Sequence, residues 1–178
     1  MKAVTKGAWG CGVVLLLASG VWVKAQQGTP ARDPFNGTWS LNVEKTKQLS
    51  GGPSPVYEVI TFAIGDDNVQ HYQVEIQTRA DGPKTKGWYD SKYNDLTFVP
   101  YQGETGKGTE LITVKVDERT HYRIARTVDG KARYVMMRRL SDDGKSYIVT
   151  GLDTDGKPLK GREIEQAVFS TFIHSQPV

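Results

Sequence analysis

The chain has 178 residues and a formal charge of +3, from 23 Lys and Arg against 20 Asp and Glu. The whole excess lies in residues 1–25, which hold three lysines, no acidic residue and the only Cys, whereas residues 26–178 carry 20 basic and 20 acidic side chains. Beyond residue 25 this composition excludes a disulfide framework, a thiol nucleophile and a thiolate metal site. It also makes nucleic acid a poor partner, because the aromatic residues are not interleaved with a basic stripe.

Residues 1–25 have the pattern of a secretory signal peptide. Two lysines precede a mostly apolar stretch at residues 12–23, and Ala25 ends a Val-Lys-Ala sequence of the kind that signal peptidases cleave. A transmembrane anchor would need about 20 apolar residues, and a lipoprotein Cys would follow the apolar stretch, whereas Cys11 precedes it. We therefore predict cleavage after Ala25 and a secreted or periplasmic protein.

The remaining chain is predicted to form one domain with short flanks. Residues 26–34 are polar with Gly and Pro among them, which indicates a flexible leader. Residues 35–168 have the size of a typical single domain with one core. Residues 169–178 are predicted to be a C-terminal tail.

From Phe35 onward, short runs of Val, Ile, Thr and Tyr alternate with turn signals, and no window shows a sustained helical period. The fold is predicted to be all-β, with eight to ten strands. The candidates are residues 38–43, 56–64, 69–78, 85–89, 95–99, 110–116, 120–128, 131–140, 146–152 and 159–168.

Two features predict how these strands are arranged. In residues 69–78 the apolar Tyr72, Val74 and Ile76 alternate with polar residues, so one face of the sheet is dry and the other wet. An Asp-Gly-Lys triplet recurs at residues 129, 143 and 155, and such triplets suit the tight turns of antiparallel hairpins. We predict an up-and-down meander and favour its closure into a barrel over two packed sheets, because open edges invite aggregation.

The most specific motif is Phe35-x-Gly37-Thr38-Trp39-x-Leu41. It resembles the first strand of the calycin superfamily (lipocalins, fatty-acid-binding proteins and avidins), and it looks most like the opening of a fatty-acid-binding protein. The longer form, through residues 44–47, is similar to uncharacterised secreted bacterial proteins described as lipocalin-like. The chain departs from these families in two respects: the lipocalin disulfide and Thr-Asp-Tyr turn are missing, and residues 50–55 are too rich in Gly and Pro for a helical lid.

The motif also assigns structural roles. Gly37 is expected to let the backbone turn tightly into the first strand, and Trp39 to plug the narrow end of the barrel. The resemblance implies that a basic side chain from the last strands packs over this ring as a cation–π pair, and Arg162 is the candidate for this role.

The sequence contains no pattern that indicates a catalytic site or a metal site. No Gly-x-Ser-x-Gly is present, and the serines fall mostly in turns. His71 and His121 are predicted to lie on the polar faces of their strands and His174 in the tail, so that no metal site is expected. We predict no catalytic residue, no metal and no cofactor.

Residues 119–139 form a basic hairpin with seven Lys and Arg against Asp129 alone. A two-residue Asp129-Gly130 turn would place residue 126 opposite 133, 124 opposite 135 and 122 opposite 137. One face then carries Tyr122, Ile124, Val135 and Met137 together with two opposed arginines, Arg126 and Arg133.

This arrangement leaves alternatives open. The two arginines could lie at the barrel rim, solvated or matched by a neighbouring acid such as Glu163. Alternatively, Arg126 and Arg133 could hold the acidic head of an amphipathic ligand whose tail lies along Tyr122, Ile124, Val135 and Met137. An anionic membrane surface or a polysaccharide is a further possible partner for the hairpin.

Three classes of function remain after these exclusions. The favoured one is non-catalytic binding of a small hydrophobic or amphipathic ligand, which could be acidic. The alternatives are an interaction or structural module without an internal ligand, and an enzyme that uses the cavity. The identity of the ligand and the oligomeric state stay open at this point, because barrels of this kind host unrelated functions.

Overall fold

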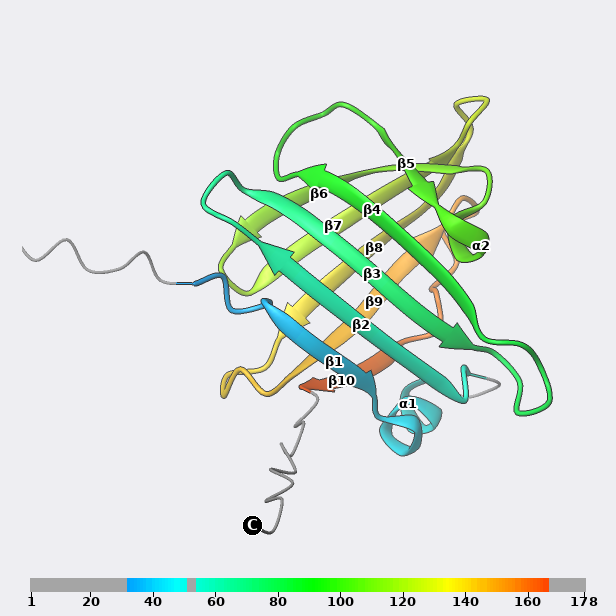
Figure 1. Cartoon of the computed structure of the whole chain (residues 1–178). Coiled ribbons are helices and arrows are strands. Elements are labelled where there is room, and N and C mark those ends of the chain that lie inside the picture. Colours follow the sequence, from blue (N-terminus) through cyan, green and yellow to red (C-terminus); the bar gives the residue numbers. More distant parts are fainter. Residues whose placement is uncertain (1–31, 51–53, 167–178) are drawn as a thin grey trace, which may run out of the picture.

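Ten antiparallel strands, each paired with its neighbour in sequence, close into a barrel when β10 pairs with β1 (Figure 1). The structure is a computed structural model that describes residues 32–50 and 54–166. The predicted all-β meander and its closure are therefore confirmed. The strands are β1 (Gly37–Leu41), β2 (Tyr57–Ile64), β3 (Val69–Gln77), β4 (Thr85–Lys92), β5 (Val99–Gln102), β6 (Thr109–Asp117), β7 (Thr120–Thr127), β8 (Ala132–Leu140), β9 (Ser146–Asp153) and β10 (Arg162–Gln166).

The local signals that predicted the meander act as expected. Tyr72 and Val74 of β3 are buried inside the barrel, while His71 and Gln73, which alternate with them, are exposed. The Asp-Gly-Lys turns reverse the chain through glycines with positive φ, 85° at residue 130, 69° at residue 144 and 74° at residue 156. Such angles are accessible to glycine at little cost, so these turns fix where the hairpins form.

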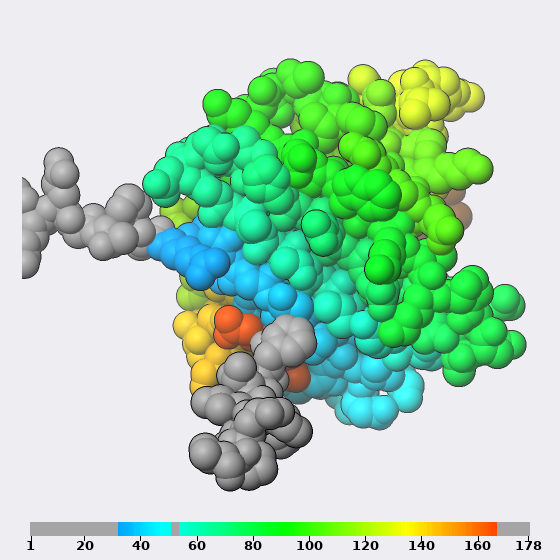
Figure 2. Space-filling model, in the orientation of Figure 1, coloured from blue at the N-terminus to red at the C-terminus, as the bar shows by residue number. Residues whose placement is uncertain are grey.

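A helix that the sequence analysis did not predict follows β1. The first strand was expected to extend to Val43, but it ends at Leu41 and α1 (Val43–Ser50) begins. Asn42 caps this helix by accepting a hydrogen bond from the Lys45 amide at 2.9 Å. The fully buried Thr46 exchanges hydrogen bonds with the backbone of Glu163 and thereby fixes α1 against β10. In Figures 1 and 2 the helix lies at the surface beside the start of β2.

Other element boundaries also differ from the prediction. The strand expected at residues 95–99 is β5, Val99–Gln102, because Asn94 adopts a positive φ of 63° and begins a loop instead. A single turn of helix, α2 (Gly103–Gly106), follows β5. Neither helix of the described part of the chain is long and apolar enough to cross a membrane.

One end of the barrel is filled by large aromatic side chains. Trp39 is completely buried, its ring centroid lies 5.0 Å from that of Tyr147, and its Nε1 donates to the Phe35 carbonyl at 2.8 Å. Phe35 in turn lies 6.0 Å from Phe62, centroid to centroid. These four residues close this end, which we call the aromatic end. Gly37 starts β1 at a φ of 130°, where an L side chain would be strained.

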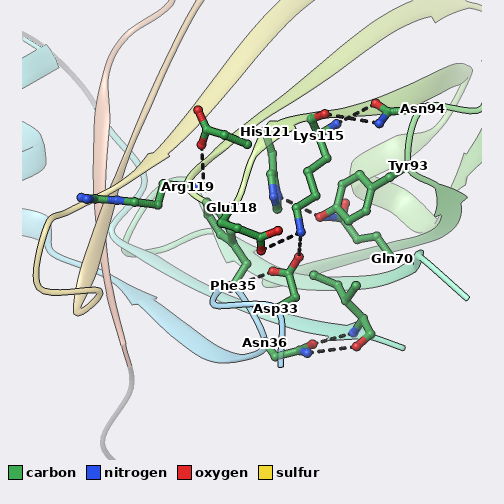
Figure 3. A network of polar contacts seen from close by, with 12 residues as sticks. Asp33, Phe35, Asn36, Gln70, Tyr93, Asn94, Lys115, Glu118, Arg119 and His121 are labelled. Atoms are coloured by element: carbon green, nitrogen blue, oxygen red, sulfur yellow. Dashed lines mark hydrogen bonds and ion pairs between the residues drawn. The ribbon is translucent and has the colours of Figure 1, made fainter. Parts of the chain in front are cut away.

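Figure 3 shows how the chain is fastened where it enters the barrel. Asp33 accepts a hydrogen bond from the Phe35 amide at 3.0 Å and forms an ion pair with Lys115 of β6, also at 3.0 Å. Asn36 exchanges hydrogen bonds with the backbone of Ile64. These contacts hold the start of β1 across the aromatic end and so position Phe35 and Trp39.

The expected cation–π contact between Arg162 and Trp39 is not among the contacts of the described residues. Arg162 forms an ion pair with the nearly buried Glu58, whose two carboxylate oxygens accept from Nη1 at 3.0 and 2.8 Å. A charge-assisted pair of this kind is stronger than contact with a ring face. The prediction for Arg162 is therefore corrected.

Candidate functional site

A cavity of about 390 Å³ opens at the end of the barrel opposite the aromatic end. Its volume is within the range of small-molecule sites, about 300 to 1,000 Å³. The side chains that line it come from strands all around the barrel and from the loops at its mouth. They are Ser54, Pro55, Glu58, Tyr72, Val74, Ile76, Tyr101, Thr105, Arg123, Tyr134, Met136, Val149, Thr150, Leu159, Lys160 and Arg162.

Two arginines point into the barrel instead of into solvent. Arg123 of β7 is 6% exposed and lines the cavity, and Arg138 of β8 is 2% exposed. Neither forms an ion pair with a described residue, whereas the buried Glu58 is already paired with Arg162. Because arginine stays protonated in proteins, the described interior contains two positive charges without a matching carboxylate.

The hydrogen bonding of these guanidinium groups is incomplete. Arg123 donates through Nη2 to the Met136 sulfur at 3.4 Å, and Arg138 donates to the Tyr89 hydroxyl at 3.4 Å. Arg123 Nε and Nη1 and Arg138 Nη1 are buried without a partner among the described residues. Burying a charge or a donor without a partner is costly. The site is therefore suited to an anion that would complete these bonds.

Aromatic rings surround the Arg123 guanidinium. Its Cζ lies 5.4 Å from the ring centroids of Tyr101 and Tyr134 and 5.6 Å from that of Tyr72. Burial raises the pKa of Tyr72 and of Tyr101 above the ordinary value. These hydroxyls therefore stay protonated at neutral pH and do not neutralise the arginine. Their ring faces stabilise the cation in part while leaving its charge in place.

A chain of polar groups lies between Arg138 and the aromatic end. The Tyr89 hydroxyl donates to Gln70 Oε1 at 2.8 Å, and Gln70 Nε2 donates to the Tyr93 hydroxyl. Tyr93 is in turn paired with His121 Nδ1 at 2.8 Å (Figure 3). These hydrogen bonds fix the polar side chains deepest in the barrel. None of these four side chains lines the cavity.

The prediction for His121 was wrong. We expected a solvated side chain, but His121 is buried, its Nε2 has no partner among the described residues, and its ring lies 4.2 Å from that of Phe35. His71, by contrast, is exposed as expected and is bonded to Asp90 at 2.7 Å. His174 lies outside the described residues. The two strands differ because the inner face of β7 carries polar side chains, which the alternation rule assigns to solvent.

The burial of His121 should make stability depend on pH. Burial, reinforced by the charge of Arg138, lowers the pKa of His121 to about 3, whereas an unfolded histidine binds a proton below about pH 6.5. The contribution of His121 to the free energy of unfolding is thus fully present above about pH 6.5 and is lost as the pH falls toward 3. Urea titrations should show a loss of about 2 kcal/mol from this group between pH 7.5 and 5.

Two variants isolate this contribution from that of the carboxyl groups. His121→Gln should remove this part of the pH dependence. His71→Gln, at an exposed position, should retain it. A pH slope in His121→Gln equal to that of the unmodified protein would contradict the assignment.

The structure places the predicted hairpin site, apart from the guanidinium of Arg133, on the outside of the barrel. Ile124 pairs with Val135 and Tyr122 with Met137, as expected, but a bulge after Ala125 places Arg126 opposite Ala132 instead of Arg133. Because the inward positions of β7 and β8 are occupied by Arg123, Ala125, Met136 and Arg138, none of the six predicted ligand residues lines the cavity. Ligand contact by this face stays a prediction, separate from the cavity.

Arg126 and Arg133, which the sequence predicted to lie opposite each other, contact other residues instead. Arg126 forms an ion pair with Glu110 of β6 at 2.8 Å and lies 3.9 Å from the Phe98 ring. Arg133 donates to the hydroxyl of Thr109. The expected matching acid, Glu163, is paired instead with Lys45 of α1 at 2.9 Å. Arg126 is thus matched by an acid of a neighbouring strand, which was one of the alternatives left open by the sequence, but the acid is Glu110 and not Glu163.

Comparisons with known proteins agree with this geometry. No family model and no curated protein sequence matches the chain. Among solved structures, a fatty-acid-binding protein of Schistosoma mansoni in complex with arachidonic acid superposes with a TM-score of 0.51 and 14% identity, over 76% of this chain and 98% of that one. The chain has the fold of a fatty-acid-binding protein.

A variant of the fluorescent protein UnaG gives a similar result, with a TM-score of 0.51 and 17% identity over 76% of this chain and 97% of that one. The predicted resemblance to the calycin superfamily is therefore confirmed as a likeness of fold. Within residues 32–50 and 54–166 no group of three His, Cys, Asp or Glu side chains could hold a metal ion. The fatty-acid-binding-protein fold here thus surrounds a cavity whose charged side chains are Glu58, Arg123, Lys160 and Arg162.

Proposed function

We propose that the protein is an exported, non-catalytic binding protein for a small amphipathic molecule with an acidic group. The acidic group enters the barrel and meets Arg123, while the apolar part lies against Val74, Met136 and Val149. The observation that carries this proposal is the buried guanidinium of Arg123, which lines the cavity with Nε and Nη1 unpartnered. The S. mansoni protein with the same fold, which holds arachidonic acid, supports it as an example.

The size of the cavity limits the ligand. With about 30 Å³ for each water molecule of liquid volume, 390 Å³ corresponds to roughly thirteen waters. The aromatic end and the polar chain beneath Arg138 occupy the rest of the barrel. A compact or bent acid fits this space, and a charged group at its inner end could bond to Arg123 and approach Arg138.

The chemistry of the cavity favours binding over catalysis. Nucleophilic or acid–base catalysis needs a nucleophile or base within hydrogen-bond reach of its activating partner. The carboxylate in the cavity wall, Glu58, is held by Arg162, and burial, which raises the pKa of Tyr72 and of Tyr101, keeps these two hydroxyls protonated. A protonated phenol and a fixed guanidinium are suited to donating hydrogen bonds to a bound acid.

Export is part of the same proposal and rests on the composition of residues 1–25, which lie outside the described residues. If it is correct, protein isolated from the growth medium or the periplasm begins at Gln26. N-terminal sequencing and the intact mass test this. A chain that retains residues 1–25 in the cytoplasm would overturn the export part and leave the cavity proposal standing.

Displacement of a fluorescent fatty-acid analogue tests the binding proposal directly. A medium-chain carboxylic acid should displace the analogue, and its methyl ester should do so at least about tenfold less well, because the ester lacks the charge that pairs with arginine. Arg123→Met should weaken binding of the acid by at least about tenfold and that of the ester much less. The matched control Arg119→Met changes a half-exposed arginine that lies outside the cavity and is paired with Asp142.

The outcome also separates the cavity from the outer face. Arg126→Ala leaves displacement unchanged if the ligand lies in the cavity, and weakens it if the hairpin face binds the ligand. Equal affinity of the acid and the ester, or no effect of Arg123→Met, would refute the role of Arg123.

A further inference from the structure

The two buried arginines lie beside each other in the interior of the barrel. In the register of β7 and β8, Arg138 lies opposite His121, two residues from Arg123. The two arginines are thus diagonal neighbours on the inward face, a relation that places backbones about 7 to 8 Å apart. Both also contact one ring: the Arg123 Cζ lies 5.6 Å from the Tyr72 centroid, and the Arg138 Cζ lies 5.2 Å from it. A single head group of a ligand can therefore interact with both guanidinium groups.

The described part of the chain does not balance the charge of this pair. Neither guanidinium forms an ion pair within residues 32–50 and 54–166, and the Glu58 carboxylate is already held by Arg162. Among the described residues, Arg123 Nε and Nη1 and Arg138 Nη1 are buried without a partner. An acid with one negative charge would neutralise one arginine and leave the other buried and unmatched, which is costly.

Given the proposed binding of an acid in the cavity, on which this step rests, we infer that the acidic group of the ligand carries two negative charges. A phosphate monoester and a malonate-type dicarboxylate have this chemistry. One charge pairs with Arg123, which lines the cavity, and the second is stabilised by Arg138, which lies behind it toward the aromatic end. The planar fork of arginine is suited to both kinds of head group, because it donates two parallel hydrogen bonds to phosphate or carboxylate oxygens.

The surroundings of the pair strengthen this preference for a second charge. Two rings, those of Tyr101 and Tyr134, have centroids 5.4 Å from the Arg123 Cζ, and the Phe62 centroid lies 5.1 Å from the Arg138 Cζ. Charges interact more strongly among such rings than in bulk water. A second negative charge on the ligand should therefore raise the affinity more than it would at an exposed pair of arginines.

Displacement of the fluorescent fatty-acid analogue by four ligands with the same octyl chain tests the inference. At about pH 8, octyl phosphate carries nearly two negative charges, since its second pKa is about 6, whereas octyl sulfate has the same tetrahedral shape and one charge. Octyl phosphate should bind at least about tenfold more tightly than octyl sulfate in a buffer without phosphate. Octylmalonate should likewise bind more tightly than octanoate, and its affinity relative to octyl phosphate shows which dianionic head group the site prefers.

Two substitutions of neighbouring arginines on β8 locate the source of this preference. Arg138→Met should lower the ratio of the two affinities, octyl phosphate over octyl sulfate, to less than about threefold, while octyl sulfate still binds through Arg123. The matched control Arg139→Met removes the same charge from an exposed position on the outer face of β8. It should change the ratio by less than about twofold.

The comparison of ligands on the unmodified protein is decisive even if Arg138→Met does not fold. Equal affinity for octyl phosphate and octyl sulfate would overturn the dianionic ligand, and so would a preference that Arg138→Met leaves intact. In both cases displacement by octanoate would leave the proposed function standing. If none of the four ligands displaces the analogue, the proposed function fails and the dianionic ligand with it.

Discussion

Replacing Trp39 with alanine is expected to lower the free energy of unfolding by about 3 to 5 kcal/mol. Trp39 has no exposed surface, its ring packs against Phe35 and Tyr147, and its indole nitrogen bonds to the Phe35 carbonyl. The substitution removes the largest side chain of the aromatic end and leaves a void that the rigid strands around it can fill only in part. It also leaves the carbonyl of Phe35 without this donor.

Trp88 provides the matched control, because it is also a strand tryptophan but is 45% exposed on the outer face of β4. Trp88→Ala should cost about 1 kcal/mol or less. Urea unfolding followed by far-ultraviolet circular dichroism measures both, and the signal does not depend on tryptophan fluorescence. Equal effects of the two substitutions would show that Trp39 does not fill the aromatic end.

The sequence was sufficient for the fold because its signals are local. The alternation around Tyr72 and Val74 identifies the core face of β3, and Asp-Gly turns at residues 129, 143 and 155 mark the hairpin reversals whatever the rest of the chain does. A meander needs little else, since each strand pairs with its neighbour in sequence. The Gly37 and Trp39 motif then indicated which closed arrangement the meander adopts.

Elements set by short segments or by tertiary contacts were missed. Helix α1 has eight residues, too few for a helical period to emerge, and it is held by the contact of Thr46 with β10. The Asn42 cap, followed by Glu44 in the first turn, was the signal that could have revealed it. The bulge after Ala125 likewise shifted Arg126 by one position and broke the predicted pairing with Arg133.

The cavity arginines were missed for a more general reason. Sequence patterns assign charged side chains to the wet face of a strand, but a ligand-binding barrel can have polar groups on both faces. In β7 the residues His121, Arg123 and Ala125 point inward, while the more apolar Tyr122 and Ile124 point outward. A prediction based on hydrophobicity alone therefore placed the ligand on the outer face of β7 instead of the face that points into the barrel.

Replacing Arg123 with methionine is expected to stabilise the empty protein, on the order of 1 to 4 kcal/mol, although it removes an interior interaction. Arg123 is buried with its charge unmatched and with Nε and Nη1 unbonded. The nearby tyrosine rings return part of the desolvation cost, typically about 0.5 to 2 kcal/mol for a cation–π contact, whereas burial of an uncompensated charge costs several kcal/mol. Methionine has a similar length, no charge, and an apolar neighbour in Met136.

The same substitution should have the opposite consequence once an acid is bound. A saturating acidic ligand should raise the thermal midpoint of the unmodified protein, in proportion to the logarithm of its concentration over Kd, and should raise that of Arg123→Met far less. Arg119→Met, at a half-exposed position that is paired with Asp142, should change the stability of the empty protein by about 1 kcal/mol or less and should keep the ligand response. If Arg123→Met instead destabilises the empty barrel, the guanidinium is already compensated within the folded chain. Its unpartnered nitrogens would then no longer argue for an acidic ligand. A gain in stability together with a loss of the ligand response would establish that Arg123 is retained for binding at the expense of stability.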